Sequence, residues 1–310
     1  TINKMCGSGL KAGMLGAQSI ASGEVDVVIA GGMESMSNTP YYLPKGRTGM
    51  RLGHGQVLDG IIHDGLWDVY NDKHMGNCAE ICAKEYKFSR EDQDNFAERS
   101  YTRSQDAISN GLYEDEIVPV AVPQRKGESI IVSVDEEPNR VNFDKMRALR
   151  PAFEKEGSVT AGNASTINDG AAAVVLMSEE KAKELGLTPL VKIVSQASAA
   201  HAPEWFTTAP VKAMNKAIEK AGLSMDEIDL FEINEAFSVV TMVAEKDLKL
   251  DSEKVNVLGG AVSMGHPIGA SGARIMCTLL NVMNQKDVNL GMASICIGGG
   301  EASAVIVERV

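Results

Sequence analysis

The chain has 310 residues, of which 44% are hydrophobic, and this length is sufficient for one large domain or two ordinary ones. Its longest apolar runs, such as residues 170–177, are far shorter than the roughly 20 residues that a membrane-spanning helix needs, and a formal net charge of −12 argues against broad nucleic-acid binding. We therefore expect neither a membrane nor a nucleic acid as a partner, and the five cysteines, whose spacing shows no disulfide framework, favour a reducing compartment inside the cell.

Predicted helices and strands alternate along the chain, which is typical of a layered α/β protein. The first element is a helix rich in small residues over residues 9–22, and a strand over residues 25–31 follows it. Because the sequence begins at Thr1, without an initiator methionine, and runs at once into this glycine-rich helix, we expect an upstream segment to have been removed. The other expected elements are strands over residues 171–177, 190–196, 229–233, 254–260 and 289–298, and helices over residues 211–221 and 272–283.

A long insertion follows the first predicted strand. Residues 40–165 contain a glycine-rich stretch, a helical stretch over residues 77–109 and a charged segment. An insertion of this length with helices of its own more often covers a ligand or contacts another subunit than forms a loose loop. We interpret it as a segment that covers a ligand.

Two parts of the sequence resemble each other. The stretch "CGSGLKAGMLGAQSI" followed by "DVVIAGGMES" parallels "GASGARIMCTLLNVM" followed by "GMASICIGGGEAS". In each part a helix of small residues leads to a strand that ends in glycines, and such helices can be buried between sheets with their backbones close together. We predict two duplicated halves: residues 1–42 and 166–188 form an incomplete N-terminal half, residues 43–165 the insertion, and residues 189–310 the C-terminal half.

The repeat places three reactive residues at the ends of its predicted elements. Cys6 follows a short strand-like run and precedes the first helix, whose positive end lowers the pKa of a thiol; for Cys6 alone, a buried structural cysteine is an equally good interpretation. His266 lies in a stiff His-Pro turn before the second helix, although such a pair is more often only a turn. Cys296 ends the strand that follows this second helix. All three can meet at one crevice.

Polar residues at another strand end add to this site. Asn234 and Glu235 follow an apolar run at the carboxyl end of a strand, where α/β proteins place their sites, and a helix N-cap is the alternative role for Asn234.

The glycines after Cys296 raise the alternative of a phosphate-binding loop. Such loops need G-x-x-x-x-G-K-[ST] or G-x-G-x-x-G between a strand and a helix, whereas "CIGGGEASAVIVE" runs from strand into strand and has no Lys. The first repeat has no cysteine at this point, and we therefore interpret Cys296 as a functional residue.

Together these motifs point to a known family. The sequence resembles the thiolases, in particular the short-chain acetyl-CoA acetyltransferases, over essentially all of its length. The motifs that carry the resemblance are "INKMCGSGLKA", "AGGMESMS", "HMGNCAE", "AGNASTINDGAAA", "NEAFS", "GGAVSMGHPIGASGAR" and "CIGGGEASA". One difference is that thiolases have a further stretch before the nucleophile. The resemblance implies a layered α-β-α-β-α architecture. It also implies condensation of two acetyl-CoA molecules to acetoacetyl-CoA and CoA, and the reverse thiolysis, through an acetyl-cysteine intermediate. CoA thioesters would be the substrates, and no cofactor would be required.

The resemblance assigns roles to the site residues. Cys6 would be the nucleophile that takes the acetyl group, with His266 as the base that keeps its sulfur deprotonated. Cys296 would remove a proton from the methyl carbon of the second acetyl-CoA. One oxyanion would be held by His266 and a water positioned by Asn234, and the other by the N–H groups of Cys6 and Gly298.

The resemblance also implies two binding sites. The residues expected to contact CoA are His74 and Met75 near the acyl and pantetheine end, Ser165 on the pantetheine, and Tyr101, Arg140 and Lys145 near the nucleotide. The residues that match a monovalent cation site, which would hold K⁺, are Tyr101, Ala161, Gly162, Ala164 and Val262.

Several alternatives stay open from the sequence. A β-ketoacyl synthase shares the nucleophilic cysteine but has no cysteine matching Cys296, which argues against that enzyme. Within the family, a broad-range 3-ketoacyl-CoA thiolase of fatty-acid degradation is the rival, and a shortened chain that only binds CoA or pairs with a full-length subunit is the non-catalytic alternative. The resemblance further implies a homodimer or homotetramer, in the cytoplasm or, alternatively, the mitochondrial matrix.

Overall fold

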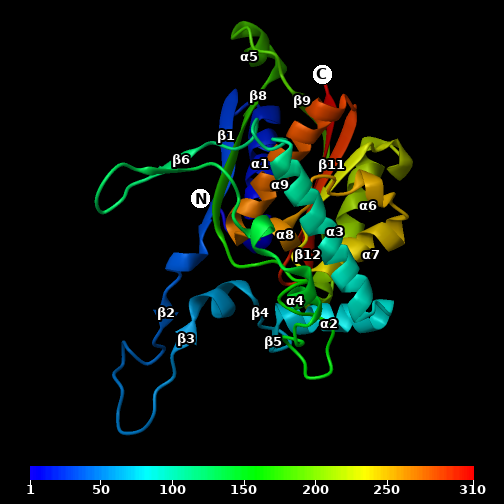
Figure 1. Cartoon of the computed structure of the whole chain (residues 1–310). Helices are drawn as coiled ribbons and strands as arrows, with labels where there is room; N and C mark the ends of the chain where they lie inside the picture. Colours follow the sequence, from blue (N-terminus) through cyan, green and yellow to red (C-terminus); the bar gives the residue numbers. More distant parts are fainter.

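Two helices rich in small residues lie at the centre of the fold (Figure 1). In the computed structural model, which describes residues 1–310, α1 (Ser8–Ala21) packs against α9 (Ile268–Lys286). A Cβ atom at Gly9 would lie 2.5 Å from the backbone N of Ala273, and one at Gly272 would overlap the backbone N of Leu10. Only glycine permits so close an approach of two helix backbones, and the two predicted central helices are confirmed.

A four-stranded sheet covers one side of this helix pair. Its strand order is β10–β11–β12–β9, with β10 and β11 parallel and the other pairs antiparallel. Alternate side chains point to opposite faces: Ala293 and Ile295 pack on α1 and α9, whereas Met292 packs on α6. The strands are β9 (Val191–Ala200), β10 (Leu230–Ile233), β11 (Leu290–Ile297) and β12 (Glu301–Arg309), and the outer helices are α6 (Ala209–Ala221) and α7 (Ser238–Leu248).

A second, two-stranded sheet lies on the other side of the helix pair. β1 (Val27–Ser35) and β8 (Asp169–Met177) pair antiparallel, although more than 130 residues separate them in the sequence. Val28 faces α1, where it would meet a Cβ atom at Gly16, whereas Ile29 and Met33 on the outer face are 77% and 78% exposed. The order of helix, strand, glycines and antiparallel strand in both halves supports the predicted duplication.

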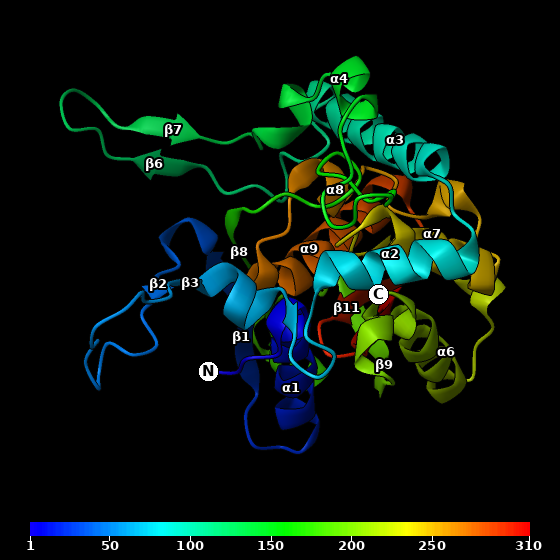
Figure 2. The same ribbon diagram turned by 90° about the horizontal axis from the view of Figure 1, so that it is seen from below.

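The insertion between β1 and β8 forms two projecting hairpins and a helical part. The β2–β3 and β6–β7 hairpins extend from the same side of the molecule (Figures 1 and 2), whereas α2 and α3 pack on α7 and α8. The elements are β2 (Tyr41–Tyr42), β3 (Leu58–Asp59), β4 (Trp67–Asp68), β5 (Lys73–His74), α2 (Met75–Tyr86), α3 (Arg90–Ser109), β6 (Val120–Val122), β7 (Ile130–Val132) and α4 (Phe143–Arg147), with α5 (Glu179–Glu184) and α8 (Ala261–Met264) later in the chain. No helix of the chain combines the length and apolar composition that crossing a membrane requires.

Two expected strands are absent. Residues 254–260 form only one bridge, between Val255 and Phe231, because Asn256 there takes a left-handed conformation (φ 45°) and its side chain replaces a strand partner for Ile233. The Asn256 amide accepts the Ile233 N–H and donates to the Ile233 carbonyl, both at 2.8 Å. Likewise no strand precedes Cys6, which lies in a short 3₁₀ helix (Met5–Gly7).

The contact between α1 and α9 generates a stability prediction. Gly272→Ala should lower the free energy of unfolding by about 1–3 kcal/mol, because the added methyl forces the two backbones apart. Gly13→Ala is the matched control on α1. Because a Cβ atom there meets nothing within 4 Å, this variant should raise the free energy of unfolding by about 0.5–1 kcal/mol. Urea unfolding followed by circular dichroism measures both, and equal effects of the two variants would contradict the close contact.

Candidate active site

Cys6 is held at the start of the first central helix by its neighbours. The 3₁₀ helix containing Cys6 packs against α9, and Ser8 bonds back to it by accepting the Lys4 N–H and donating to the Met5 carbonyl. Gly7 lies so close to Ile297 that a Cβ atom there would overlap the Ile297 side chain. The Cys6 side chain is buried beside the end of β11 as a result.

His266 lies just before α9, in a turn whose hydrogen bonds fix the tautomer of its imidazole. Its backbone N–H donates to the Thr166 carbonyl, and its Nδ1 lies 2.6 Å from Ser271 Oγ. Because Ser271 Oγ donates its own hydrogen to the Pro267 carbonyl at 3.0 Å, we assign the imidazole hydrogen to Nδ1, from which it is donated to Ser271. Nε2 is then an acceptor, and it is buried without a partner in the chain, as a general base requires.

Asn234 ends β10 and presents a free amide to the same region. Its backbone N–H donates to the Ser294 carbonyl on β11, while both polar atoms of its side chain are buried without a partner. The N-cap role is wrong, because α7 begins only at Ser238. Two consecutive residues link Asn234 to His266: the Ser165 N–H donates to the Ala236 carbonyl, and the Thr166 carbonyl receives the His266 N–H.

Glu235, next to Asn234, has a different environment. Its buried carboxylate accepts hydrogen bonds from Ser100 Oγ at 2.7 Å, Asn256 Nδ2 at 2.8 Å and the Val262 N–H at 3.1 Å. With its oxygens occupied by three donors, Glu235 holds the end of β10 in place and is not free for proton transfer.

Cys296 lies near the end of β11, fully buried in an apolar cluster with Met75 and Phe237. After it the chain turns through Gly299 (φ 93°) and Gly300 (φ 83°) into β12, as the interpretation against a phosphate loop requires. A Cβ atom at Gly298 would be 3.5 Å from Met75 Sδ, so α2 of the insertion covers this turn.

Burial dominates the electrostatics of the site. It raises the pKa of the Cys6 thiol to about 11, and hydrogen bonding by the N–H groups of Gly298 and Cys6 offsets only part of this effect. Burial also raises the pKa of Cys296 well above its usual value, and burial followed by the charge of Arg274 lowers the pKa of His266 to about 3. The expected lowering of the Cys6 pKa by the helix end is therefore wrong for the free protein: burial leaves both the Cys6 thiol and the His266 imidazole neutral.

The residues expected to contact CoA fall into two groups. His74 caps α2 by accepting the Gly76 N–H at 3.0 Å, and its ring stacks on Phe153 with centroids 4.9 Å apart, so His74 and Met75 lie together beside Cys296. Ser165 donates to the Ala236 carbonyl at 3.0 Å. Farther out, Arg140 pairs with Glu136 and Glu137 at 3.0 and 3.2 Å, and Lys145 is exposed on α4.

Three of the residues expected around a cation share one buried neighbour. Tyr101 and Val262 belong to a cluster with Met146, and a Cβ atom at Gly162 would overlap Met146. Ala161 precedes Gly162, whereas Ala164 lies toward Phe237 through an isolated bridge. No group of three or more His, Cys, Asp or Glu side chains in the chain could hold a metal ion, and the Glu235 carboxylate contacts these residues through the Val262 N–H.

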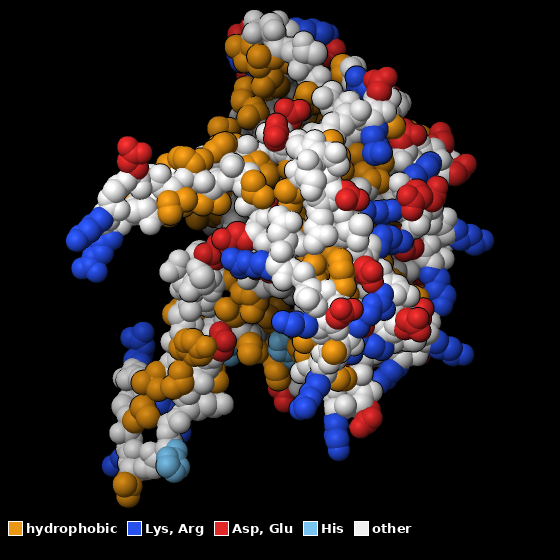
Figure 3. Space-filling view, in the orientation of Figure 1, with side chains coloured by type: hydrophobic (Ala, Val, Ile, Leu, Met, Phe, Trp, Pro, Cys, Tyr) orange, Lys and Arg blue, Asp and Glu red, His pale blue; other side chains and the backbone are white.

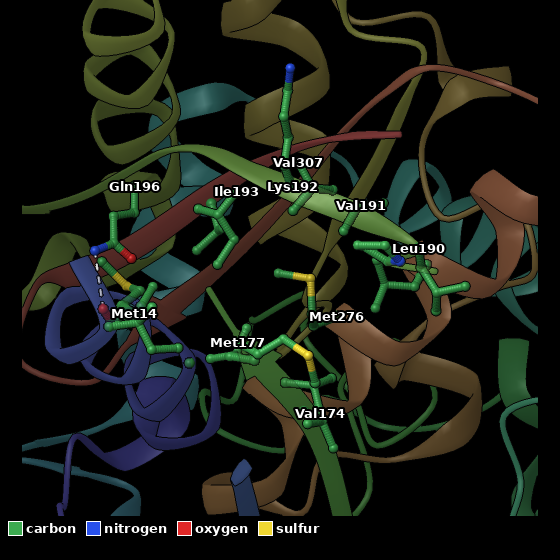
Figure 4. A pocket seen from close by; sticks show the side chains of 18 of the residues that line it. Met14, Val174, Met177, Leu190, Val191, Lys192, Ile193, Gln196, Met276 and Val307 are labelled. Carbon is green, nitrogen blue, oxygen red and sulfur yellow. Dashed lines mark hydrogen bonds between the residues drawn. The ribbon is translucent and has the colours of Figure 1, made fainter. Parts of the chain in front are cut away.

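A large hollow of the molecule lies elsewhere. A groove of about 1020 Å³ is lined by α1, β8, β9 and α9, with Met14, Met177 and Met276 among its apolar side chains (Figure 4). None of the expected site residues lines it, so size alone does not locate the chemistry.

Sequence reasoning missed Ser271, Thr166 and Phe153, which orient His266 and His74. Ser271 had a local signal: a hydroxyl residue five positions after a histidine, within the first turn of the helix. Thr166 acts through its carbonyl and Phe153 through a contact distant in sequence, and neither leaves a signal in the residue pattern.

Comparisons with known proteins agree with this arrangement. Residues 1–180 match the family "Thiolase, N-terminal domain", and residues 187–309 match "Thiolase, C-terminal domain". The chain is 52% identical over 311 residues to "Acetyl-CoA acetyltransferase" of Schizosaccharomyces pombe and 50% identical over 310 residues to that of Pseudomonas aeruginosa, covering 100% of the chain and 79% of each relative. It superposes on the acetyl-CoA acetyltransferase of Bacillus anthracis with a TM-score of 0.97 (44% identity; 100% of this chain, 78% of that one). For the Acat5 thiolase of Ascaris suum in complex with coenzyme A, the TM-score is 0.94 (45% identity; 100% and 79%).

The neutral resting state of the Cys6 thiol predicts how its reactivity depends on pH. The rate of Cys6 alkylation by iodoacetamide should rise about tenfold per pH unit from pH 7 to 9 without levelling off, because the thiolate fraction grows in this way at every pH below the thiol pKa. Peptide mapping by mass spectrometry measures the rate, with a short cysteine peptide, whose thiol pKa of about 8.5 makes its rate begin to level off within this range, as the control. A plateau already reached at pH 7 would mean that Cys6 rests as a thiolate.

Proposed function

Because the chain belongs to the thiolase family, we propose that it is an acetyl-CoA C-acetyltransferase that condenses two acetyl-CoA molecules to acetoacetyl-CoA and CoA and catalyses the reverse thiolysis. The observation that carries the proposal is a set of buried groups at the ends of the central elements: the Cys6 and Cys296 thiols, and His266 Nε2 and the Asn234 amide, which have no partner in the chain. This set supplies a nucleophile, a base, an oxyanion donor and a second acid-base group, the groups that thioester exchange and carbon–carbon bond formation need.

In the first step, His266 Nε2 takes the Cys6 proton as the sulfur attacks the acetyl carbonyl. Ser271 supports this role, since it fixes the Nδ1–H tautomer and leaves Nε2 as the acceptor. Neutral resting groups suit this order of events, because the buried charges form only when the substrate is present to stabilise them. CoA departs as its thiol after receiving the proton, and an acetyl group remains on Cys6.

In the second step, Cys296 passes its thiol proton to His266 and, as a thiolate, removes a proton from the methyl group of the next acetyl-CoA. The carbanion attacks the acetyl-cysteine, and the departing Cys6 sulfur recovers a proton from His266. Burial keeps Cys296 a neutral thiol in the free protein, which supports a role in which it also returns a proton to the departing carbanion in thiolysis. The resulting oxyanions would be stabilised by two sets of donors: His266 with the Asn234 amide, and the N–H groups of Cys6 and Gly298. Removing one such donor typically costs about 3 kcal/mol of barrier.

The surroundings of Cys296 support a short acyl group. Met75 Sδ lies against Gly298, and His74 is braced by Phe153, so little space is left for a long chain beside the turn. Ser165 is proposed to contact the pantetheine, and Tyr101, Arg140 and Lys145 the nucleotide. The Arg140 guanidinium would exchange Glu136 and Glu137 for the CoA phosphates, which bind a guanidinium more strongly than exposed carboxylates do.

We further propose an assembly of two or four copies of the chain. Apolar side chains on the two hairpins and on the outer face of the β1–β8 sheet support it: Met33, Leu52 and Val118 are each at least 78% exposed, and Figure 3 shows apolar side chains along both hairpins. Sedimentation would then give the mass of two or four chains. The cytoplasm is the proposed compartment, with the mitochondrial matrix as the alternative, and the five free cysteines suit the reducing environment of either.

The two cysteine roles predict different failures. Cys6→Ala should abolish acetyl transfer, whereas Cys296→Ala should still accept an acetyl group on Cys6 but lose condensation by at least about 10³-fold, since no other group replaces its proton transfer. Incubation with acetyl-CoA, whose leaving group does not need Cys296, followed by intact mass and peptide mapping, detects the acetyl group. An unmodified Cys6 in the unsubstituted protein would favour the non-catalytic alternative, and normal condensation by the Cys296 variant would refute the acid-base role.

A bound K⁺ would be held by oxygen atoms of Tyr101, Ala161, Gly162, Ala164 and Val262 and would order the loop that carries Ser165. The nearby buried carboxylate of Glu235, which contacts the Val262 N–H, supplies negative charge that favours a cation there. Replacing K⁺ by Na⁺ should therefore reduce thiolysis severalfold in the unsubstituted protein but not in Tyr101→Phe, which lacks the hydroxyl ligand. The same salt effect in both proteins would refute the site.

A further inference from the structure

Glu34, near the end of β1, makes a long-range contact with the helix that follows His266. Its Oε2 accepts the backbone N–H of Gly269 at 2.9 Å, although 235 residues separate the two in the sequence. Glu34 forms no ion pair within 4.0 Å, and the catalytic steps described above do not use it. A partly buried carboxylate in this position needs an explanation other than a salt bridge.

The start of α9 lacks a cap from its own segment. Pro267 occupies the N-cap position and offers no side-chain hydrogen bond, and the N–H groups of Ala270 and Ser271 both turn back to its carbonyl. Glu34 satisfies the Gly269 N–H that is left over and places a negative charge at the positive end of a 19-residue helix. Glu34 thus does from another strand what an N-cap residue does locally.

The backbone around this contact allows little movement. A Cβ atom at Gly32 would overlap the Gly269 carbonyl, and one at Gly170, the residue opposite Glu34 in the sheet, would lie 2.7 Å from Pro267 Cγ. The β1–β8 sheet therefore bears directly on the turn that carries His266. A shift of the first turn of α9 would move the imidazole with it.

A glutamate of the second half makes the corresponding contact with the first half. Aligning the glycines of "GGMES" with those of "GGGEA" makes Glu301 the counterpart of Glu34. Glu301 forms an ion pair with Lys4, two residues before Cys6, at the start of α1. Each half thus uses the glutamate after its strand glycines to anchor the segment that leads into the other half's central helix.

We propose that Glu34 is a positioning residue, which fixes the start of α9 through the Gly269 N–H and so holds the His266 imidazole opposite Cys6. This inference rests on the proposed transferase function only for its effect on turnover. The anchoring itself is a property of the free protein and is measured without substrate.

The test compares Glu34→Ala, which removes the contact, with Glu34→Gln, whose amide oxygen can still accept the Gly269 N–H. Glu24→Gln is the control, since it removes an exposed charge of the same half that makes no contact with α9. Glu34→Ala should lower kcat for acetoacetyl-CoA thiolysis at least tenfold with KM changed less than twofold, and should speed amide hydrogen exchange in residues 266–272 at least tenfold. Glu34→Gln should stay within threefold of the unsubstituted protein in both measurements, and Glu24→Gln should change neither.

Two results would overturn the proposal. One is exchange over residues 266–272 that Glu34→Ala leaves unchanged, and the other is an equal loss of kcat in Glu34→Ala and Glu34→Gln, which would make charge the decisive property. If Glu34→Ala does not fold, Glu34→Asp replaces it, and its shorter side chain should accelerate hydrogen exchange over the same residues. Unchanged exchange in Glu34→Asp, or loss of the fold in this variant too, refutes the positioning role of Glu34. If no form of the protein acts on acetoacetyl-CoA, the proposed function fails, while hydrogen exchange still decides the role of Glu34.

Discussion

The backbone contact between α1 and α9 is the constraint on which the rest of the structure depends. Gly9 and Gly272 let the helices approach until the backbone of each meets the other. Because Cys6 and His266 each lie two residues before one of these helices, this contact sets how far the proposed nucleophile lies from its proposed base. The two sheets then cover opposite sides of the helix pair. Any residue larger than glycine in this contact would separate the two halves of the site.

Burial gives the site its chemical character. It disfavours the thiolate of Cys6 and the imidazolium of His266 by similar means, so the free protein holds neither charge. Unpartnered buried groups normally cost free energy, and the Asn234 side-chain amide and His266 Nε2 are among those of this chain. The cost is tolerated where the substrate can supply the missing partners. By contrast, Glu235, one residue away, has three donors and belongs to the scaffold.

Much of this arrangement could be predicted from the sequence because it is recorded in local patterns. Small residues in two similar stretches predicted the central helices, and that prediction is confirmed. The meeting of Cys6, His266 and Cys296 at one crevice, which the order of these stretches indicates, stays a prediction. Other features depend on contacts distant in sequence. The hydrogen bonds of Asn256 to Ile233 replace an expected strand, and Glu34 reaches Gly269 across 235 residues. The pKa of Cys6 was mispredicted for a related reason: the helix end is visible in the sequence, whereas the burial that outweighs it depends on the packed insertion and sheets.

The insertion also explains why only one of two similar halves carries a second cysteine. Aligning the glycines after each strand makes Ile29 the counterpart of Cys296, and both side chains point away from the central helices. Within one chain Ile29 is 77% exposed, on a face that the proposed assembly would cover with another copy, whereas in the second half α2 and Phe237 cover the corresponding face and Cys296 is fully buried. The proposed proton-transfer role therefore goes with the strand position that the insertion encloses within the same chain, and the insertion makes the two similar halves chemically different.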